Sequence, residues 1–287
     1  MKVVSPFRNI AIAGVGLIGG SLGLGLKKYT RGVCITGLGR NLHRLCLAKK
    51  LGAIDRIRLK LSAGVANQDL VILAQPVAII KKTLAKIAPF LKEGAVVMDV
   101  AGTKESICRE ARKRLPATVH FIGTHPLAGS EKTGVDSASP DLFRSARCIL
   151  IRARRREDRE AFKKIALIFK ILGGKVMAMT AREHDEVMSV ISHLPHLAAQ
   201  ALVGAVAGSN PRALRLAASG FRDTTRIAQS SPEIWRDIFM DNKKNILRHL
   251  SRYEKELKNL RSLIAKERPD RLFAYLNKVS KIRKTIS

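Results

Sequence analysis

The chain has 287 residues, which allows one large domain or two ordinary ones. Apolar residues make up 46% of it, enough for a substantial core, so composition excludes a disordered protein. The 53 lysines and arginines exceed the 23 acidic residues and give a net charge of +30, which indicates an anionic partner. Only 5% of residues are aromatic, which disfavours base stacking and favours a small phosphorylated or carboxylated molecule over nucleic acid.

Strand and helix patterns alternate through the first part of the chain. Short apolar runs predict strands at 9–13, 33–36, 69–74, 95–99, 118–122 and 148–151. Helical patterns lie between them, at 17–29, at 41–51 and from Thr103. This alternation predicts a mostly parallel sheet with helices on both faces.

After Met179 the pattern becomes helical almost to the end, with long amphipathic stretches from Ala181 and from Pro232. We therefore expect an α/β domain over 1–180 and an all-helical domain over 181–287. The helical half carries more apolar stripes than one small sheet domain can cover, which predicts assembly through these helices.

The sequence predicts a cytoplasmic protein with no membrane span. Residues 1–9 lack the apolar stretch of a signal peptide. The uncharged run 10–26 is marginal for a membrane helix, and its six glycines have a better explanation, given below. None of the four cysteines forms a C-x-x-C pair, which favours buried free thiols in a reducing compartment.

A glycine pattern follows the first strand and opens the first helix. The segment Gly14, Val15, Gly16, Leu17, Ile18, Gly19 matches G-x-G-x-x-G. Its first glycine permits a tight turn, its second lets a pyrophosphate approach the backbone, and its third lets helix and strand pack closely. The strand–turn–helix context therefore predicts a dinucleotide site of the Rossmann type.

The end of the second strand bears on which dinucleotide binds. NAD sites usually place an acid there, whereas this chain has Gly39, Arg40 and Asn41, and Arg44 follows. Two arginines without a carboxylate favour NADP, although Arg40 stacked on adenine would also suit NAD. Ala74 and Pro76, at the end of the third strand, complete the predicted dinucleotide-binding set.

Two polar residues follow later strands. His125 comes after strand 118–122 and is held extended by Pro126, so it is a candidate proton acceptor. Thr103 follows strand 95–99, where it could serve catalysis or only cap the next helix.

The helical half offers two candidate segments. Asp185, Ser189, Ser192 and His196 share one face of the helix from Ala181, which Pro195 should kink. The histidine spacing fits no zinc motif, so we predict no metal site. Further on, Arg222 and Arg226 follow Gly220 and could grip a carboxylate, or form a surface ion pair with Asp223. The single tryptophan, Trp235, follows on the next helix.

Taken together, these segments resemble the prephenate/arogenate dehydrogenases of tyrosine biosynthesis. The resemblance covers roughly residues 9–250 and rests on motifs that occur in the family's order: 14–19, Asp99–Lys104, Thr124–Glu131, His184–Asp185, Ser192–His196 and Gly220–Arg226. It is similar to the monofunctional two-domain form, since we find no chorismate mutase segment before it and too little chain after it for a regulatory ACT domain.

The resemblance implies roles for individual residues. His125 would take the proton of the ring hydroxyl, with Thr103 where the family usually has serine. Arg226 would bind a substrate carboxylate, and His196, Ser192 and Trp235 would line the substrate site. Glu131 would act as a gating acid.

The implied activity is oxidative decarboxylation of prephenate, of arogenate or of both, with hydride transfer to NAD(P), by a homodimer built from the C-terminal helices. Prephenate against arogenate, and feedback by tyrosine, stay open. One alternative is a β-hydroxyacid dehydrogenase or ketopantoate-type reductase, which would use a helical lysine such as Lys243 or Lys244. A basic nucleic-acid-binding protein on a Rossmann core is the alternative from another class.

Overall fold

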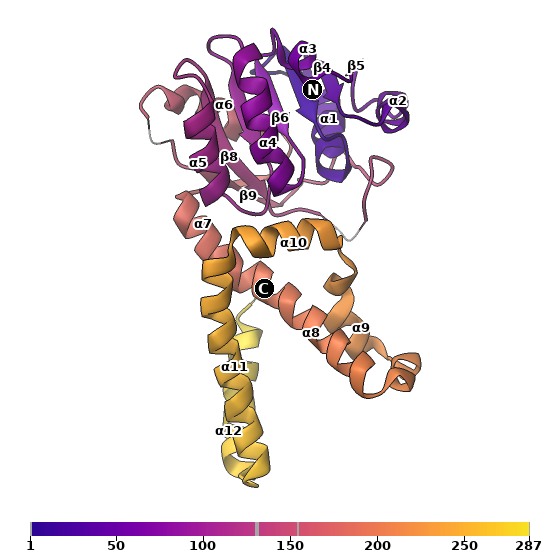
Figure 1. Cartoon of the computed structure of the whole chain (residues 1–287), viewed down its shortest axis with the longest axis vertical. Coiled ribbons are helices and arrows are strands. Elements are labelled where there is room, and N and C mark those ends of the chain that lie inside the picture. Colours follow the sequence, from indigo (N-terminus) through magenta and orange to yellow (C-terminus); the bar gives the residue numbers. More distant parts are fainter. Residues whose placement is uncertain (1, 130–131, 154, 287) are drawn as a thin grey trace. The chain divides into compact units, whose positions relative to one another are not determined.

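The computed structural model describes residues 2–129, 132–153 and 155–286 (Figure 1). The chain divides into two compact units, Met1–Asn242 and Lys243–Ser287, and each is described by itself. The predicted domain boundary at 180 falls inside the first unit and stays a prediction.

A sheet of eight strands forms the centre of the first unit, in the order β10-β9-β8-β7-β6-β2-β4-β5. Its strands are β2 Asn9–Ala13, β4 Cys34–Leu38, β5 Arg56–Arg58, β6 Leu70–Leu73, β7 Val96–Asp99, β8 His120–Pro126, β9 Arg147–Ile151 and β10 Lys175–Met179. All neighbours are parallel except β8 and β9. The first six strands have the order of a Rossmann sheet, which confirms the predicted fold class. A separate two-stranded sheet pairs β1 Val3–Val4 with β3 Thr30–Arg31.

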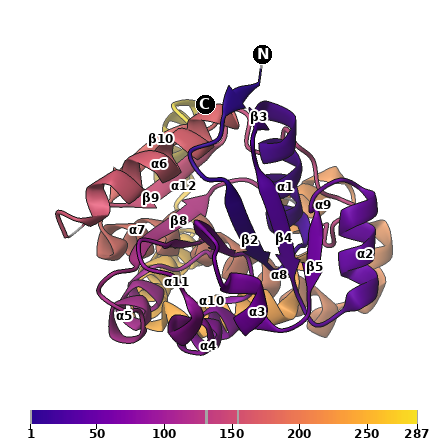
Figure 2. The same cartoon turned by 90° about the horizontal axis from the view of Figure 1, so that it is seen from above.

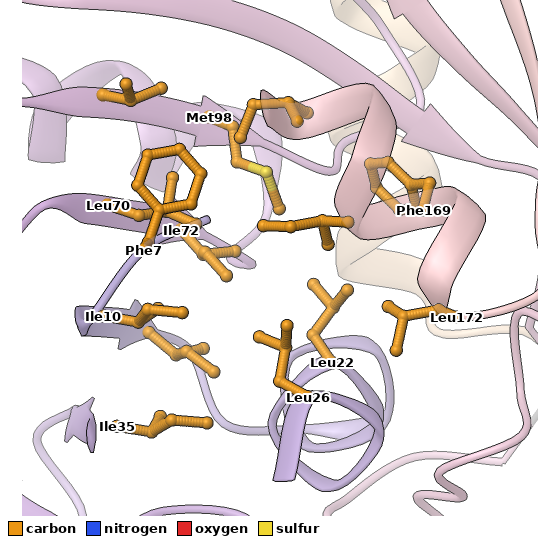
Figure 3. Packing of buried hydrophobic residues seen from close by; sticks show 14 of the residues in the cluster. Phe7, Ile10, Leu22, Leu26, Ile35, Leu70, Ile72, Met98, Phe169 and Leu172 are labelled. Atoms are coloured by element: carbon orange, nitrogen blue, oxygen red, sulfur yellow. The ribbon is translucent and has the colours of Figure 1, made fainter. Parts of the chain in front are cut away.

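Helices cover both faces of the sheet (Figure 2). They are α1 Leu17–Tyr29, α2 Leu42–Lys50, α3 Leu61–Val65, α4 Val77–Ile87, the 3₁₀ turn Ala88–Phe90, α5 Glu105–Arg114 and α6 Asp158–Ile171. On one face Leu22 and Leu26 of α1 and Phe169 of α6 pack against Ile10 and Ile72 (Figure 3). On the other face α4 and α5 cover the alternate side chains of the same strands. The strands are buried on both faces, and their near-continuous apolar sequences are the reason.

The rest of the first unit is helical. It comprises α7 Ala181–Met188, a π-helical turn Ser189–His193, α8 Leu194–Ser209, 3₁₀ helices Pro211–Leu216 and Arg226–Gln229, α9 Ser219–Thr225 and α10 Pro232–Asp241. The kink predicted at Pro195 occurs as the π-helical turn just before it, and Pro195 lies in the first turn of α8. Within the described residues, Ala181–Ser209 is the one stretch long and apolar enough to cross a membrane, by length and composition alone.

The second unit consists of α11 Lys243–Ala265 and α12 Pro269–Lys284, and the Tyr275 hydroxyl donates to the Glu256 carboxylate between them. Apolar side chains stay exposed along α12, among them Phe273, Leu276 and Ile282.

Some predicted boundaries were wrong. Strands β5 and β10 were not predicted. Strand β5 is only three residues long and two of them are arginines, whereas β10 does contain an apolar run, Val176–Met179, that could have been used. Strand β8 runs to Pro126, beyond the predicted end at 122, because antiparallel pairing of His125 with Ile149 extends it. The four cysteines are free, but only Cys148 is buried, so the expectation of buried thiols fails for the exposed Cys46.

Candidate active site

One continuous cavity of about 1930 Å³ crosses the first unit at the carboxyl ends of the sheet strands. At one end its wall is the glycine loop after β2, and at the other it is formed by His125, Arg226 and Trp235. Strands β2 and β6 are neighbours here although a crossover separates them in sequence, so this is the switch point where such sheets bind ligands.

The glycine loop has the shape that a pyrophosphate requires. Gly14 has φ of +95°, and a Cβ there would collide with the carbonyl oxygen of Ala74. A Cβ on Gly16 would meet nothing within 4 Å and would project into space that the phosphates need. Gly19 lies behind the loop, packed against Gly14 and Ile12. Each glycine therefore has the property predicted for it, and the backbone fits a dinucleotide.

The structure brings the other predicted dinucleotide-binding residues to the same cavity. Gly39, Arg40 and Asn41 line it beside the end of β4, together with Ala74 and Pro76. The Asn41 side chain also caps α2, accepting the backbone N–H of Arg44 at 3.0 Å.

Two cationic residues that sequence reasoning missed line this same cavity. Lys82 and Lys86, both exposed, are four residues apart on α4. Their spacing on one helix face is a signal that could have been used, but nothing in the sequence tells which face of α4 meets the cavity.

His125 lies at the cavity wall within strand β8. Its Nδ1 is 2.8 Å from Nε2 of His184, a fully buried residue of α7. Burial, together with the nearby His184 and the Lys104 cation, lowers the pKa of His125 well below its ordinary value of 6.5. The imidazole is therefore neutral at neutral pH, as a proton acceptor must be.

Thr103 does not reach the cavity. Its side chain is fully buried, and its hydroxyl donates to Asp241 at 2.6 Å. Ser106 and Lys81 bind the same carboxylate, at 2.7 and 2.6 Å. Burial alone would raise the pKa of Asp241, but these three partners together lower it. The loop after β7 thus turns the Thr103 side chain toward the end of α10, and its place beside the substrate stays a prediction.

The neighbour of Thr103 takes the place beside the base. A Cβ added to Gly102 would lie 4.0 Å from Cε1 of His125. On the other side of Thr103, Lys104 is fully buried and forms an ion pair with the fully buried Asp99. This ion pair places a cation near His125, and sequence reasoning did not identify it.

The residues predicted for the substrate end divide into two groups. Ser192, His196, Arg226 and Trp235 line the cavity, and the rings of His196 and Trp235 stack with centroids 3.4 Å apart. Arg222 does not line the cavity, so of the two arginines that the sequence offered as carboxylate-binding residues only Arg226 lies at the site.

The remaining predicted residues lie elsewhere. Ser189 turns inward and donates to the Glu186 carbonyl oxygen, and Asp185 is buried against the start of α5. The π-helical turn, which contains both Ser189 and Ser192, changes the helical spacing here, so the single polar face predicted for these residues is divided. Glu131 lies outside the described residues.

Comparison with known proteins agrees with this geometry. A family model described as "Prephenate dehydrogenase, nucleotide-binding domain" matches residues 22–178. A second, described as "Prephenate dehydrogenase, dimerization domain", matches residues 180–278. The chain belongs to the prephenate dehydrogenase family. The family resemblance inferred from the motifs is therefore confirmed, and the reductase alternative is not favoured.

Individual members of the family are similar over almost the whole chain. The prephenate dehydrogenase of Bacillus subtilis is 37% identical over 93% of this chain and 73% of its own length. A crystal structure of prephenate dehydrogenase from A. aeolicus with hydroxyphenyl propionate and NAD+ has 32% identity and a TM-score of 0.91, covering 98% of each chain. The arogenate dehydrogenase of Synechocystis has 31% identity and a TM-score of 0.81, over 97% of this chain and all of its own.

Proposed function

We propose that this protein is an oxidoreductase that catalyses the NAD(P)-dependent oxidative decarboxylation of prephenate, arogenate or both, in tyrosine biosynthesis. The observation that carries the proposal is the single cavity that joins a pyrophosphate-binding glycine loop to a neutral histidine and an arginine. Family membership supports the same reaction.

The residues at the cavity wall suit this chemistry. When bound, the dinucleotide supplies the acceptor for the hydride on the ring carbon that bears the hydroxyl. His125 takes the hydroxyl proton on Nε2 as that carbon becomes a carbonyl carbon. The bond to the ring carboxylate then breaks and releases carbon dioxide. Its electron pair moves through the ring to the carbonyl oxygen, which regains a proton from His125 and leaves an aromatic product.

Arg226 is the proposed anchor for a substrate carboxylate, since a guanidinium can bind a carboxylate through two hydrogen bonds. The stacked rings of His196 and Trp235, with Ser192 nearby, form the proposed wall for the rest of the substrate. Glu131 keeps its proposed gating role from the family resemblance. Thr103 is proposed to act only through Asp241, which it helps to hold in place.

For the cofactor we propose that NADP is used at least as well as NAD. The cavity wall holds Arg40 and Arg44, close to Gly39 in the sequence, and also Lys82 and Lys86 of α4. Such a group of cations suits a 2′-phosphate, and the chain offers no acid at the position where NAD sites hold the ribose hydroxyls. The NAD+ bound to the A. aeolicus structure shows that a family member takes the unphosphorylated form.

We further propose a homodimer assembled through the C-terminal helices. The matched dimerization-domain model supports this arrangement. So does the apolar stretch Ala181–Ser209, since only 11% of its apolar 18-residue window is buried within one chain. A second subunit would cover this surface in a soluble cytoplasmic enzyme, with neither a membrane nor nucleic acid as partner. A monomer at micromolar concentration in light scattering would contradict the dimer.

A steady-state assay tests the reaction directly. The purified protein is given prephenate or arogenate, each with NAD or NADP, and both the reduced nicotinamide and the aromatic product are measured. We expect turnover with at least one of the two substrates, and an NADP kcat/KM no lower than that for NAD. Turnover of simple β-hydroxyacids in place of both substrates would contradict the proposal.

A further inference from the structure

Three side chains, from His125 at the cavity wall to Asp185 behind it, form a continuous hydrogen-bonded row. His125 Nδ1 is 2.8 Å from His184 Nε2, and His184 Nδ1 is 2.7 Å from Asp185 Oδ1. We propose that His184 and Asp185 are positioning residues, which fix the tautomer of His125 so that Nδ1 carries the proton and Nε2 presents its lone pair to the cavity. This inference rests on the proposed function for its catalytic meaning, although the tautomer can be observed without it.

The proton positions follow from the partners of Asp185. Its carboxylate also accepts the backbone N–H groups of Lys104 at 2.7 Å and of Glu105 at 2.8 Å. Three donors therefore converge on one carboxylate, which serves all three as an acceptor. The proton of His184 must then lie on Nδ1, where it is donated to Asp185.

His184 in turn determines the state of His125. Burial lowers the pKa of His184 to about 2, so the ring is neutral and carries only one proton. With that proton on Nδ1, Nε2 of His184 can only accept, and the donor is Nδ1–H of His125. Because His125 is also neutral, its Nε2 is left bare. A ring held in the other tautomer could not take a proton from a substrate hydroxyl.

The row is fixed at both ends by the fold. Asp185 joins α7 to the start of α5, and the Asn242 side chain donates to its backbone oxygen at 2.7 Å. His184 is fully buried and Asp185 nearly so, at 0% and 3% exposed. Neither lines the cavity, so both act through His125, and buried partners of this kind restrict the orientation of the ring that they contact.

Nitrogen-15 NMR of the full-length protein with labelled histidine tests the inference. In the unmodified protein we expect His125 to be protonated on Nδ1 and bare on Nε2. His184→Leu removes the acceptor, so the His125 proton should move to Nε2 and kcat should fall at least about tenfold, with both KM values little changed. A glutamine in His184→Gln can still accept a hydrogen bond from His125 and donate one to Asp185. This variant should therefore keep much of the Nδ1 tautomer of His125 and much of the kcat that His184→Leu loses.

The matched control lies on the same strand. His120, on β8, also contacts an aspartate, with Nδ1 2.9 Å from Asp158 Oδ1, but does not line the cavity. His120→Leu should leave the His125 tautomer and kcat unchanged.

A proton on Nε2 of His125 in the unmodified protein would overturn the proposed positioning role of His184 and Asp185. It would do so even if the enzyme turns over prephenate, and regardless of how the variants behave. The same holds if folded His184→Leu keeps the Nδ1 tautomer. The expected tautomer without turnover of prephenate or arogenate would instead remove the proposed function and leave the row of hydrogen bonds standing.

Discussion

Acidification should weaken this fold at a pH where most proteins of ordinary composition are still stable. His125 and His184 are in contact and His193 lies close enough to affect both, and each of the three has a lowered pKa for which burial is the largest cause. The pKa is about 2 for His184 and about 4 for His193, against an ordinary value of 6.5. Between those values and 6.5 the unfolded chain binds more protons than the folded chain, so stability falls as pH falls below 6.5.

The magnitude follows from the ordinary pKa alone. At pH 5.5 an imidazole in the unfolded chain is about nine-tenths protonated, and holding it neutral in the fold costs about 1.4 kcal/mol. Three such side chains together cost about 4 kcal/mol, which is a large part of the 5–15 kcal/mol typical of a folded domain. Carboxyl groups with a lowered pKa, such as those of Asp55 and Asp69, reduce the stability of the fold only when the pH falls to about 3.8 or below, so they do not contribute at pH 5.5.

Urea unfolding at pH 8 and pH 5.5 measures this loss. Asp99 and Asp185 act in the opposite sense, because burial raises their pKa, so a variant is needed to isolate the histidines. His193→Gln can keep the contacts to Asn242 and to the Gly102 backbone while removing the titrating group. The loss between the two pH values should shrink by about 1.4 kcal/mol in this variant. An identical loss of stability in both proteins would show that His193 does not contribute to the acid sensitivity of the fold.

The other predictions concern the proposed reaction. His125→Asn should keep dinucleotide binding and lower kcat by about 10²- to 10⁴-fold, and a kcat within about threefold of the unmodified enzyme would remove it as the base. Arg226→Ala should raise KM for prephenate at least about tenfold, which corresponds to about 1.4 kcal/mol of binding free energy. Arg222 does not line the cavity, so Arg222→Ala should raise this KM less. A larger KM increase in Arg222→Ala than in Arg226→Ala would show that Arg222 is the carboxylate anchor. Gly39→Asp should shift preference from NADP toward NAD, because it adds the carboxylate that NAD sites usually have at this position. The substitution is sterically possible, since a Cβ at Gly39 would meet the Leu45 side chain at an ordinary 3.7 Å. An unmodified enzyme with a kcat/KM for NAD about tenfold above that for NADP would contradict the cofactor assignment.

Much of the fold could be predicted because its signals are local. The run 17–29 gave the bounds of α1 because a glycine turn precedes it and an extended residue, Thr30, ends it. The apolar runs of β2, β6 and β7 are buried on both faces, which is the pattern of a parallel sheet. Strand β10 was not predicted although it contains the apolar run Val176–Met179, and it lies at the sheet edge with much of its surface exposed.

The parts of the site that could not be predicted depend on contacts between distant segments. Thr103 was expected near the substrate, and only the fold shows that its hydroxyl binds Asp241, far along the chain. The contact between His125 and His184 likewise joins β8 to α7. The π-helical turn 189–193 shifts the helical spacing, so equal steps along the sequence do not mark one face.

The stoichiometry of the reaction distinguishes oxidative decarboxylation from a simple dehydrogenation. The purified enzyme is given a limiting amount of prephenate or arogenate with excess NADP, and separately with excess NAD. Carbon dioxide, reduced nicotinamide and aromatic product are then measured in the same sample. We expect one equivalent of carbon dioxide, of reduced nicotinamide and of aromatic product for every substrate molecule consumed, with at least one of the two substrates. Reduction of the dinucleotide without release of carbon dioxide, or no consumption of either substrate, would contradict it.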